Sequence, residues 1–149
     1  MTQALQTLEI IRQFKAPRER VFDAFSSFDA MKQWFGPGTC NCTGGAVEFA
    51  VGGRYQMKME TPGGEMTVLG TYKEIERPSR IVFTWKWDDD EDWNHVESTV
   101  ELDFIESGAG TELRLRQTGF PNEESRGRHT QGWTGGFDKL QGLVDGRAG

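Results

Sequence analysis

One histidine in the 149-residue sequence is placed where it could take part in binding or proton transfer. His129 precedes Trp133 by four residues, so the two side chains share a face if the segment is helical. An imidazole on an apolar helix face can anchor a ligand or act as a general base, because its ordinary pKa lies near neutrality. The alternative is a core histidine that bonds a strand residue such as Gln117. No nucleophile or acid partner stands out beside His129, so we predict no catalytic residue.

A second group of residues has the chemistry to bind an apolar molecule. Aromatic and methionine side chains recur on one parity of several alternating segments, and flat rings and adaptable thioethers suit an irregular apolar ligand. Ordinary core residues give the same pattern. The ligand-binding wall that we predict consists of Trp34, Tyr55, Met57, Met59, Met66, Tyr72, Phe83, Trp85, Trp87, Gln117, His129, Trp133 and Phe137.

The last apolar segment is rich in glycine, which bears on whether a cavity exists. Each glycine inside a helix costs about 0.5 to 1 kcal/mol relative to alanine, so five cost about 3 to 5 kcal/mol. Small residues that leave volume for a ligand, or that let the helix bend, would offset this cost. The alternative is that some glycines lie in frayed or broken helix. The glycines concerned are Gly127, Gly132, Gly135, Gly136 and Gly142.

Charged residues give two further hypotheses about the pocket. Arg12 shares the parity of apolar residues in its segment, so it either points into the pocket, where it needs an acidic partner or an anionic ligand, or lies at an exposed strand end. Glu101 and Asp103 fall on the polar parity of their segment and are expected to face solvent. We assign these two carboxylates no chemistry.

Metal ligands are present but poorly arranged. The acidic run Asp88–Asp92 with His95 could hold a hard cation, but its spacing lacks the glycine of a calcium loop and favours a solvated hairpin loop. Cys40 and Cys42 could join a histidine in binding zinc, yet nothing in the sequence places them together. We therefore predict neither a metal site nor a cofactor.

The composition limits the class of protein and its partners. Hydrophobic residues make up 36% of the chain, enough for a core, and the length fits one domain over residues 1–149. The net charge of −6 and the scattered basic residues argue against a nucleic-acid partner. No apolar run is long enough for a membrane span, and no export signal is apparent, so we expect a cytoplasmic protein. A monomer and a homodimer both remain open.

The elements that must position these residues begin with a strand and two short helices. Alternation over 7–14 predicts a strand with one inward face. Pro17 can open a short helix that includes Phe25, and Asp29 can cap a second helix. Gly and Pro then indicate a loop over 36–45.

An antiparallel meander follows, because the pattern alternates for about seventy residues. We count a six-stranded region there in addition to the first strand. The clearest runs are 54–60, 66–75, 81–87, 98–105 and 111–118.

One long helix closes the chain. Asn122 is a suitable N-cap, and two glutamates follow it in the first turn, where negative charge is favourable. The apolar face comprises His129, Trp133, Phe137, Leu140 and Val144. A curved sheet wrapped around this helix is an α+β domain, and incomplete packing between them would leave a cavity.

Several strings, in the same order along the chain, resemble the family of proteins similar to the C-terminal domain of the activator of the 90-kDa heat-shock protein ATPase. This family belongs to the START-like (SRPBCC) helix-grip superfamily. The strings are APRERVFDAF from Ala16, WFGP from Trp34, GGRY from Gly52, GTYKEIERPSRIVFTW from Gly70, TELRLRQTGFP from Thr111 and H-x-x-G-W from His129.

The resemblance implies a single START-like domain of order β-α-α-β6-α with a pocket between sheet and last helix. Relatives include lipid carriers, ligand binders, cyclase domains and the chaperone activator, so the resemblance does not imply one reaction. Our preferred hypothesis is binding or carriage of a small hydrophobic ligand. The alternatives are a cyclase- or hydrolase-like enzyme that uses His129 in the same pocket, and a stress-response protein that modulates a chaperone ATPase.

Overall fold

The computed structural model describes residues 7–35, 41–88, 90–94 and 96–145. Its elements follow the expected α+β order, with seven strands, two short helices and one long helix. Their bounds are β1 Thr7–Phe14, α1 Arg18–Asp23, α2 Phe28–Met31, β2 Asn41–Val47, β3 Arg54–Thr61, β4 Gly64–Glu76, β5 Arg80–Trp87, the 3-10 helix η2 Glu91–Trp93, β6 Ser98–Ser107, β7 Gly110–Thr118 and α3 Glu123–Asp145.

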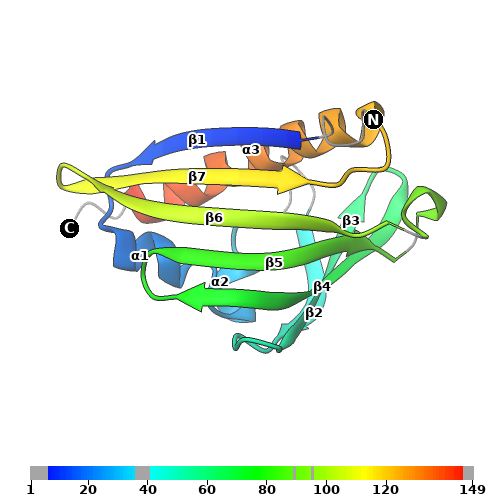
Figure 1. Ribbon diagram of the computed structural model, residues 1–149, viewed down its shortest axis with the longest axis horizontal. Helices are drawn as coiled ribbons and strands as arrows, with labels where there is room; N and C mark the ends of the chain where they lie inside the picture. Colours follow the sequence, from blue (N-terminus) through cyan, green and yellow to red (C-terminus); the bar gives the residue numbers. More distant parts are fainter. Residues whose placement is uncertain (1–6, 36–40, 89, 95, 146–149) are drawn as a thin grey trace.

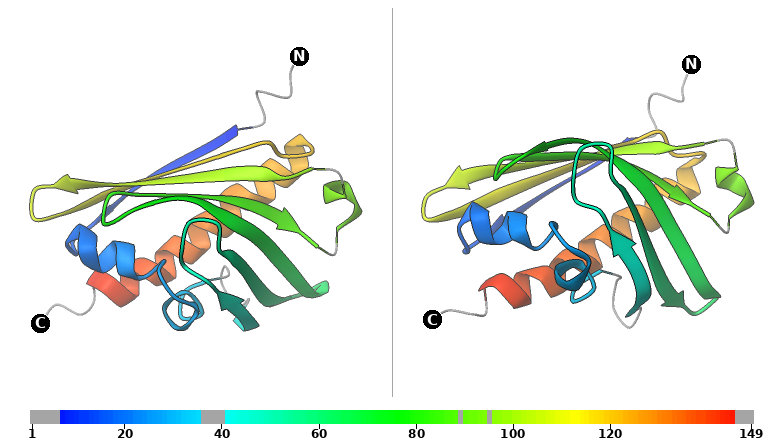
Figure 2. Two further views of the ribbon diagram at one scale, coloured as in Figure 1. Left: turned by 60° about the horizontal axis from the view of Figure 1, so that its bottom comes forward. Right: turned by 90° about the horizontal axis from the view of Figure 1, so that it is seen from below.

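The seven strands form one antiparallel sheet of order β1-β7-β6-β5-β4-β3-β2 (Figure 1). Strands β2 to β7 follow chain order, and β1 adds to the far edge beside β7. The sheet bends around α3, which crosses its concave side (Figure 2). This is the helix-grip arrangement predicted from the sequence, and it buries apolar side chains of every strand except β2.

The long helix α3 is continuous from Glu123 to Asp145. The Asn122 side chain accepts a hydrogen bond from the Ser125 amide at 2.8 Å, which confirms the predicted N-cap. All five glycines of this segment lie within the helix, so the alternative of a broken or frayed end is wrong.

Three local predictions are corrected near the N-terminal helices. The loop expected over 36–45 is wrong from Asn41 onward, where β2 pairs with β3. The second helix is capped by Ser27, whose hydroxyl accepts from the Ala30 amide at 3.1 Å, and not by Asp29. That helix also ends at Met31, so Trp34 lies in the turn after it and Phe35 directly follows that turn.

Arg12 joins β1 to α3 and does not line the pocket. Its guanidinium contacts the Asp138 carboxylate at 2.8 Å and donates to Gln141 Oε1 at 3.0 Å. The acidic partner that a part-buried arginine needs is therefore supplied by the helix. Farther along the same seam, the Asp145 carboxylate accepts from the backbone amides of Lys15 and Ala16.

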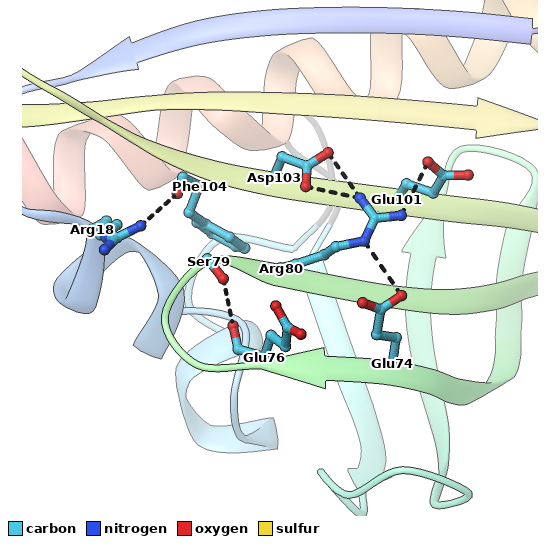
Figure 3. Close-up of polar contacts among 8 residues, drawn as sticks. All are labelled: Arg18, Glu74, Glu76, Ser79, Arg80, Glu101, Asp103 and Phe104. Carbon is cyan, nitrogen blue, oxygen red and sulfur yellow. Dashed lines mark hydrogen bonds and ion pairs between the residues drawn. The ribbon is translucent and has the colours of Figure 1, made fainter.

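The face of the sheet opposite α3 carries an ion-pair network centred on Arg80 (Figure 3). Arg80 contacts Asp103 at 2.8 Å, and contacts Glu74 and Glu101 at 3.4 Å each. The hydrogen bonds of Arg80 to these carboxylates raise its pKa above the ordinary value, and the bond to Asp103 contributes most. Glu101 and Asp103 lie on the polar parity as expected, and their partner is an arginine of the neighbouring strand.

Candidate functional site

A cavity of about 430 Å³ lies between α3 and the inner face of β3, β4 and β5. Most of its wall is apolar, and cavities of this size accept small organic ligands. The lining residues are Trp34 and Phe35 after α2, Met59 and Thr61 of β3, Met66 of β4, Trp85 and Trp87 of β5, Asp90 and Trp93 beyond it, and Arg128, His129, Gly132, Trp133 and Gly136 of α3.

His129 joins two tryptophans in the wall of this cavity. Its Nε2 accepts a hydrogen bond from Trp87 Nε1 at 2.8 Å and another from Trp85 Nε1 at 3.1 Å. Its Nδ1 lies 2.7 Å from the Ser125 carbonyl oxygen. Because an indole N–H only donates and a carbonyl only accepts, the imidazole is neutral and carries its proton on Nδ1.

The bonding of His129 determines what it can do chemically. Burial lowers its pKa to about 4, and a proton on Nε2 would face two indole N–H donors. Both ring nitrogens are already engaged, so no lone pair is free to take a proton from a ligand. The geometry therefore favours a histidine that shapes the wall over a general base.

Gln117 supports the wall from behind without lining the cavity. Its side-chain oxygen accepts from Trp133 Nε1 at 2.8 Å, and its amide donates to Ser98 Oγ at 2.9 Å. Gln117 and His129 thus bond different tryptophans, and the suggested bond between them is wrong. His129 does bond strand residues, as the core alternative required, but these belong to β5.

The glycines of α3 affect the cavity at two positions. A Cβ atom added at Gly132 would meet no atom within 4 Å, because it would project into open space. A Cβ added at Gly136 would meet the Trp34 ring at 3.6 Å, which is ordinary contact. Gly127 and Gly142 also face open space, but neither lines the cavity. Small residues therefore leave cavity volume at Gly132 and allow close packing at Gly136.

The thirteen predicted wall residues divide into seven that line the cavity and six that lie in the filled core. Tyr55, Tyr72 and Phe83 surround a void of only about 10 Å³, so this part of the concave face is filled. The seven that line the cavity are Trp34, Met59, Met66, Trp85, Trp87, His129 and Trp133. The six that lie in the core outside it are Tyr55, Met57, Tyr72, Phe83, Gln117 and Phe137.

Sequence reasoning missed Trp93, which the structure places in the cavity wall. It lies on η2, directly after the acidic run, and is 0% exposed. Its ring packs on His129 and on Phe120, with centroids 5.5 and 6.1 Å away. The solvated loop predicted for the acidic run is therefore followed directly by a buried aromatic residue. The other lining residues that were not predicted are Phe35, Thr61, Asp90, Arg128, Gly132 and Gly136.

Metal ligands do not gather in the part of the chain that the structure describes. Within it, no three histidine, cysteine or acidic side chains lie close enough together to hold an ion. Cys42 is a free, half-buried thiol, and burial raises its pKa. Cys40, Asp89 and His95, which entered the metal hypotheses, lie outside the described residues.

A seven-stranded antiparallel sheet that grips a C-terminal helix around a cavity defines a START-like protein. The family described as activator of Hsp90 ATPase homolog 1-like protein matches residues 15–145, and the chain belongs to this family. Comparison with curated proteins finds no match.

Solved structures share the fold over nearly the whole chain. A protein of Chromobacterium violaceum is 26% identical with a TM-score of 0.85, and the alignment covers 95% of this chain and 98% of that one. The AHSA1 protein of Silicibacter pomeroyi is also 26% identical, with a TM-score of 0.79 and coverage of 93% and 96%. A Rhizobium leguminosarum protein is 25% identical, with a TM-score of 0.79 and coverage of 95% and 94%. None of the described helices combines the length and apolar character needed to cross a membrane.

Proposed function

We propose that this protein binds a small aromatic, hydrophobic molecule in the cavity between α3 and the sheet. The observation that carries the proposal is the gathering of all five tryptophans of the sequence around one cavity of about 430 Å³. Aromatic walls bind flat apolar ligands through large contact areas and ring stacking. The alternative of general-base catalysis gains no support, because both nitrogens of His129 are bonded within the protein.

The tryptophans make the proposal directly testable. Each indole N–H gives a separate proton signal in an NMR spectrum, and all five indoles belong to the cavity wall. Titration with 2-naphthylmethanol is expected to shift several of these signals. A ligand present at a hundred times its dissociation constant should also stabilise the fold by about 2.7 kcal/mol. Unchanged signals across a broad set of apolar aromatic compounds would refute the proposal.

Replacing Gly132 by leucine is expected to weaken naphthylmethanol binding at least tenfold while stabilising the protein. The new side chain would occupy open cavity space, and leucine is a better helix former than glycine by about 0.8 kcal/mol. Binding is measured by NMR titration, and stability by urea unfolding.

Gly127→Leu is the matched control for this variant. Gly127 lies on the same helix and also faces open space, but it does not line the cavity. The control should gain similar stability and keep its affinity for the probe. Equal affinities in the two variants would place the binding site elsewhere.

A further inference from the structure

The cavity has a buried inner end and an exposed mouth. Trp34, Trp85 and Trp133 are at most 6% exposed, and they also line the filled part of the core, so they mark the inner end. Asp90 and Arg128 are the two charged residues of the wall, and both are at least partly exposed. They therefore mark the mouth of the cavity.

The inner end offers nothing to a polar group of the ligand. The Trp34 indole donates to the Ala24 carbonyl at 3.0 Å, and the indoles of Trp85 and Trp133 donate to His129 and Gln117. No charged side chain lies there among the described residues. A polar or charged substituent buried at this end would lose its water without a replacement. The buried part of a bound molecule is accordingly bare hydrocarbon, and any head group lies at the mouth.

The segment at the mouth carries more acidic than basic side chains. Arg128 is ion-paired with Glu124 at 3.3 Å, whereas none of the described acids of 88–92 forms an ion pair. The nearby Lys86 ammonium is directed to the carbonyl oxygen of Asn94 at 3.4 Å. Exposed charges act weakly one by one, but these acids share one short segment and their fields add.

The Asp90 carboxylate is held in place at this mouth. Its Oδ1 accepts from the Asp92 amide at 3.0 Å, which caps η2. The buried Trp93 ring then fixes η2 against His129 of α3 and against Phe120, which lies between β7 and α3. A carboxylate that is fixed before binding costs less entropy when it pairs with a ligand.

We propose, resting on the ligand-binding function proposed above, that the cavity selects aromatic amines whose hydrocarbon rings lie among the tryptophans and whose protonated amine lies at the mouth beside Asp90. A carboxylate head group at the same place would be repelled by the acidic segment. An uncharged head group would form no ion pair with Asp90.

Three probes of one shape test this proposal: 2-naphthylmethylamine, 2-naphthylmethanol and 2-naphthoate. Their dissociation constants are measured by NMR titration of the indole signals at low ionic strength and pH 7. The amine is expected to bind about fivefold more tightly than the alcohol, as a partly exposed ion pair allows. The carboxylate is expected to bind more weakly than the alcohol, and added salt should narrow both differences.

Asp90→Asn removes the charge while keeping a side chain that can cap η2. It should bring the dissociation constants of the amine and the alcohol to within twofold of each other. Glu91→Gln is the control, because it changes the net charge equally at an exposed acid that does not line the cavity, and it should keep most of the advantage.

The possible outcomes separate the two proposals. If the alcohol binds but the amine has no advantage, or if Asp90→Asn leaves that advantage intact, the selection of amines is wrong and the ligand-binding function stands. Tighter binding of the carboxylate than of the amine would overturn the selection in the same way. If none of the three probes moves an indole signal, both proposals fail for aromatic ligands of this size.

Discussion

Replacing Gly70 by alanine is expected to lower the free energy of unfolding by about 3 kcal/mol or more, because the added methyl group has no space. A Cβ atom at this position would lie 1.9 Å from the Thr84 carbonyl oxygen and 2.7 Å from the Tyr55 ring. The carbonyl belongs to the neighbouring strand β5, so it cannot move aside as a flexible side chain would. Urea unfolding followed by circular dichroism measures the loss.

Tyr55 explains why β4 has a glycine at this point. The Tyr55 ring lies against Gly70, and its hydroxyl donates to the Thr84 carbonyl at 2.5 Å. Burial raises the pKa of this phenol well above its ordinary value, which keeps the hydroxyl protonated as a donor. Gly44→Ala is the control within a strand, since its Cβ would come no nearer than 4.0 Å to the Lys58 side chain. Equal stability of the two variants would show that the sheet relaxes around Gly70 far more easily than its contacts suggest.

The second large effect is a loss of stability in acid that depends on His129. The folded-state pKa of about 4 lies below the ordinary 6.5, so the unfolded chain binds a proton between these values and the folded chain does not. Stability is therefore fully present above pH 6.5 and falls as the pH decreases toward 4. At 1.36 kcal/mol per pKa unit, the loss over this window amounts to about 3 kcal/mol.

The His129→Gln variant isolates this contribution, because glutamine offers an acceptor oxygen to the two indoles but does not titrate. Unfolding free energies of both proteins are measured at intervals from pH 7 to pH 4. The wild-type curve is expected to fall relative to that of the variant, whereas contributions from carboxylates and from His95 are common to both. Parallel curves would mean that burial does not keep the imidazole neutral in the folded protein.

The general arrangement of the fold was predictable because long, strongly periodic segments specify it. The alternating runs of β5 and β7 and the helical spacing of α3 each indicate one buried face, and the structure places these faces toward a common core. Strand β2 was not predictable in the same way. Its sequence NCTGGAV lacks alternation, and a register shift between Cys42 and Gly44 interrupts its pairing with β3.

The division between cavity and core could not be predicted from parity. Tyr72 and Met66 lie on the same face of β4, yet the first fills the core and the second lines the cavity. The difference depends on where α3 crosses the bent sheet, which periodicity does not record. Trp93 was missed for another reason: a single 3-10 turn is too short to show a period, and the preceding acids indicated solvent.

The pairing of β1 with β7 has a consequence for how the protein is made. Thr7 pairs with Thr118, so during synthesis β1 leaves the ribosome about a hundred residues before its partner strand. At typical rates of translation this interval lasts roughly 5 to 20 s. During that time Leu8 and Phe14, which are buried in the finished sheet, have no neighbouring strand to cover them. The apolar side chains of β1 therefore stay uncovered on the nascent chain until β7 has emerged.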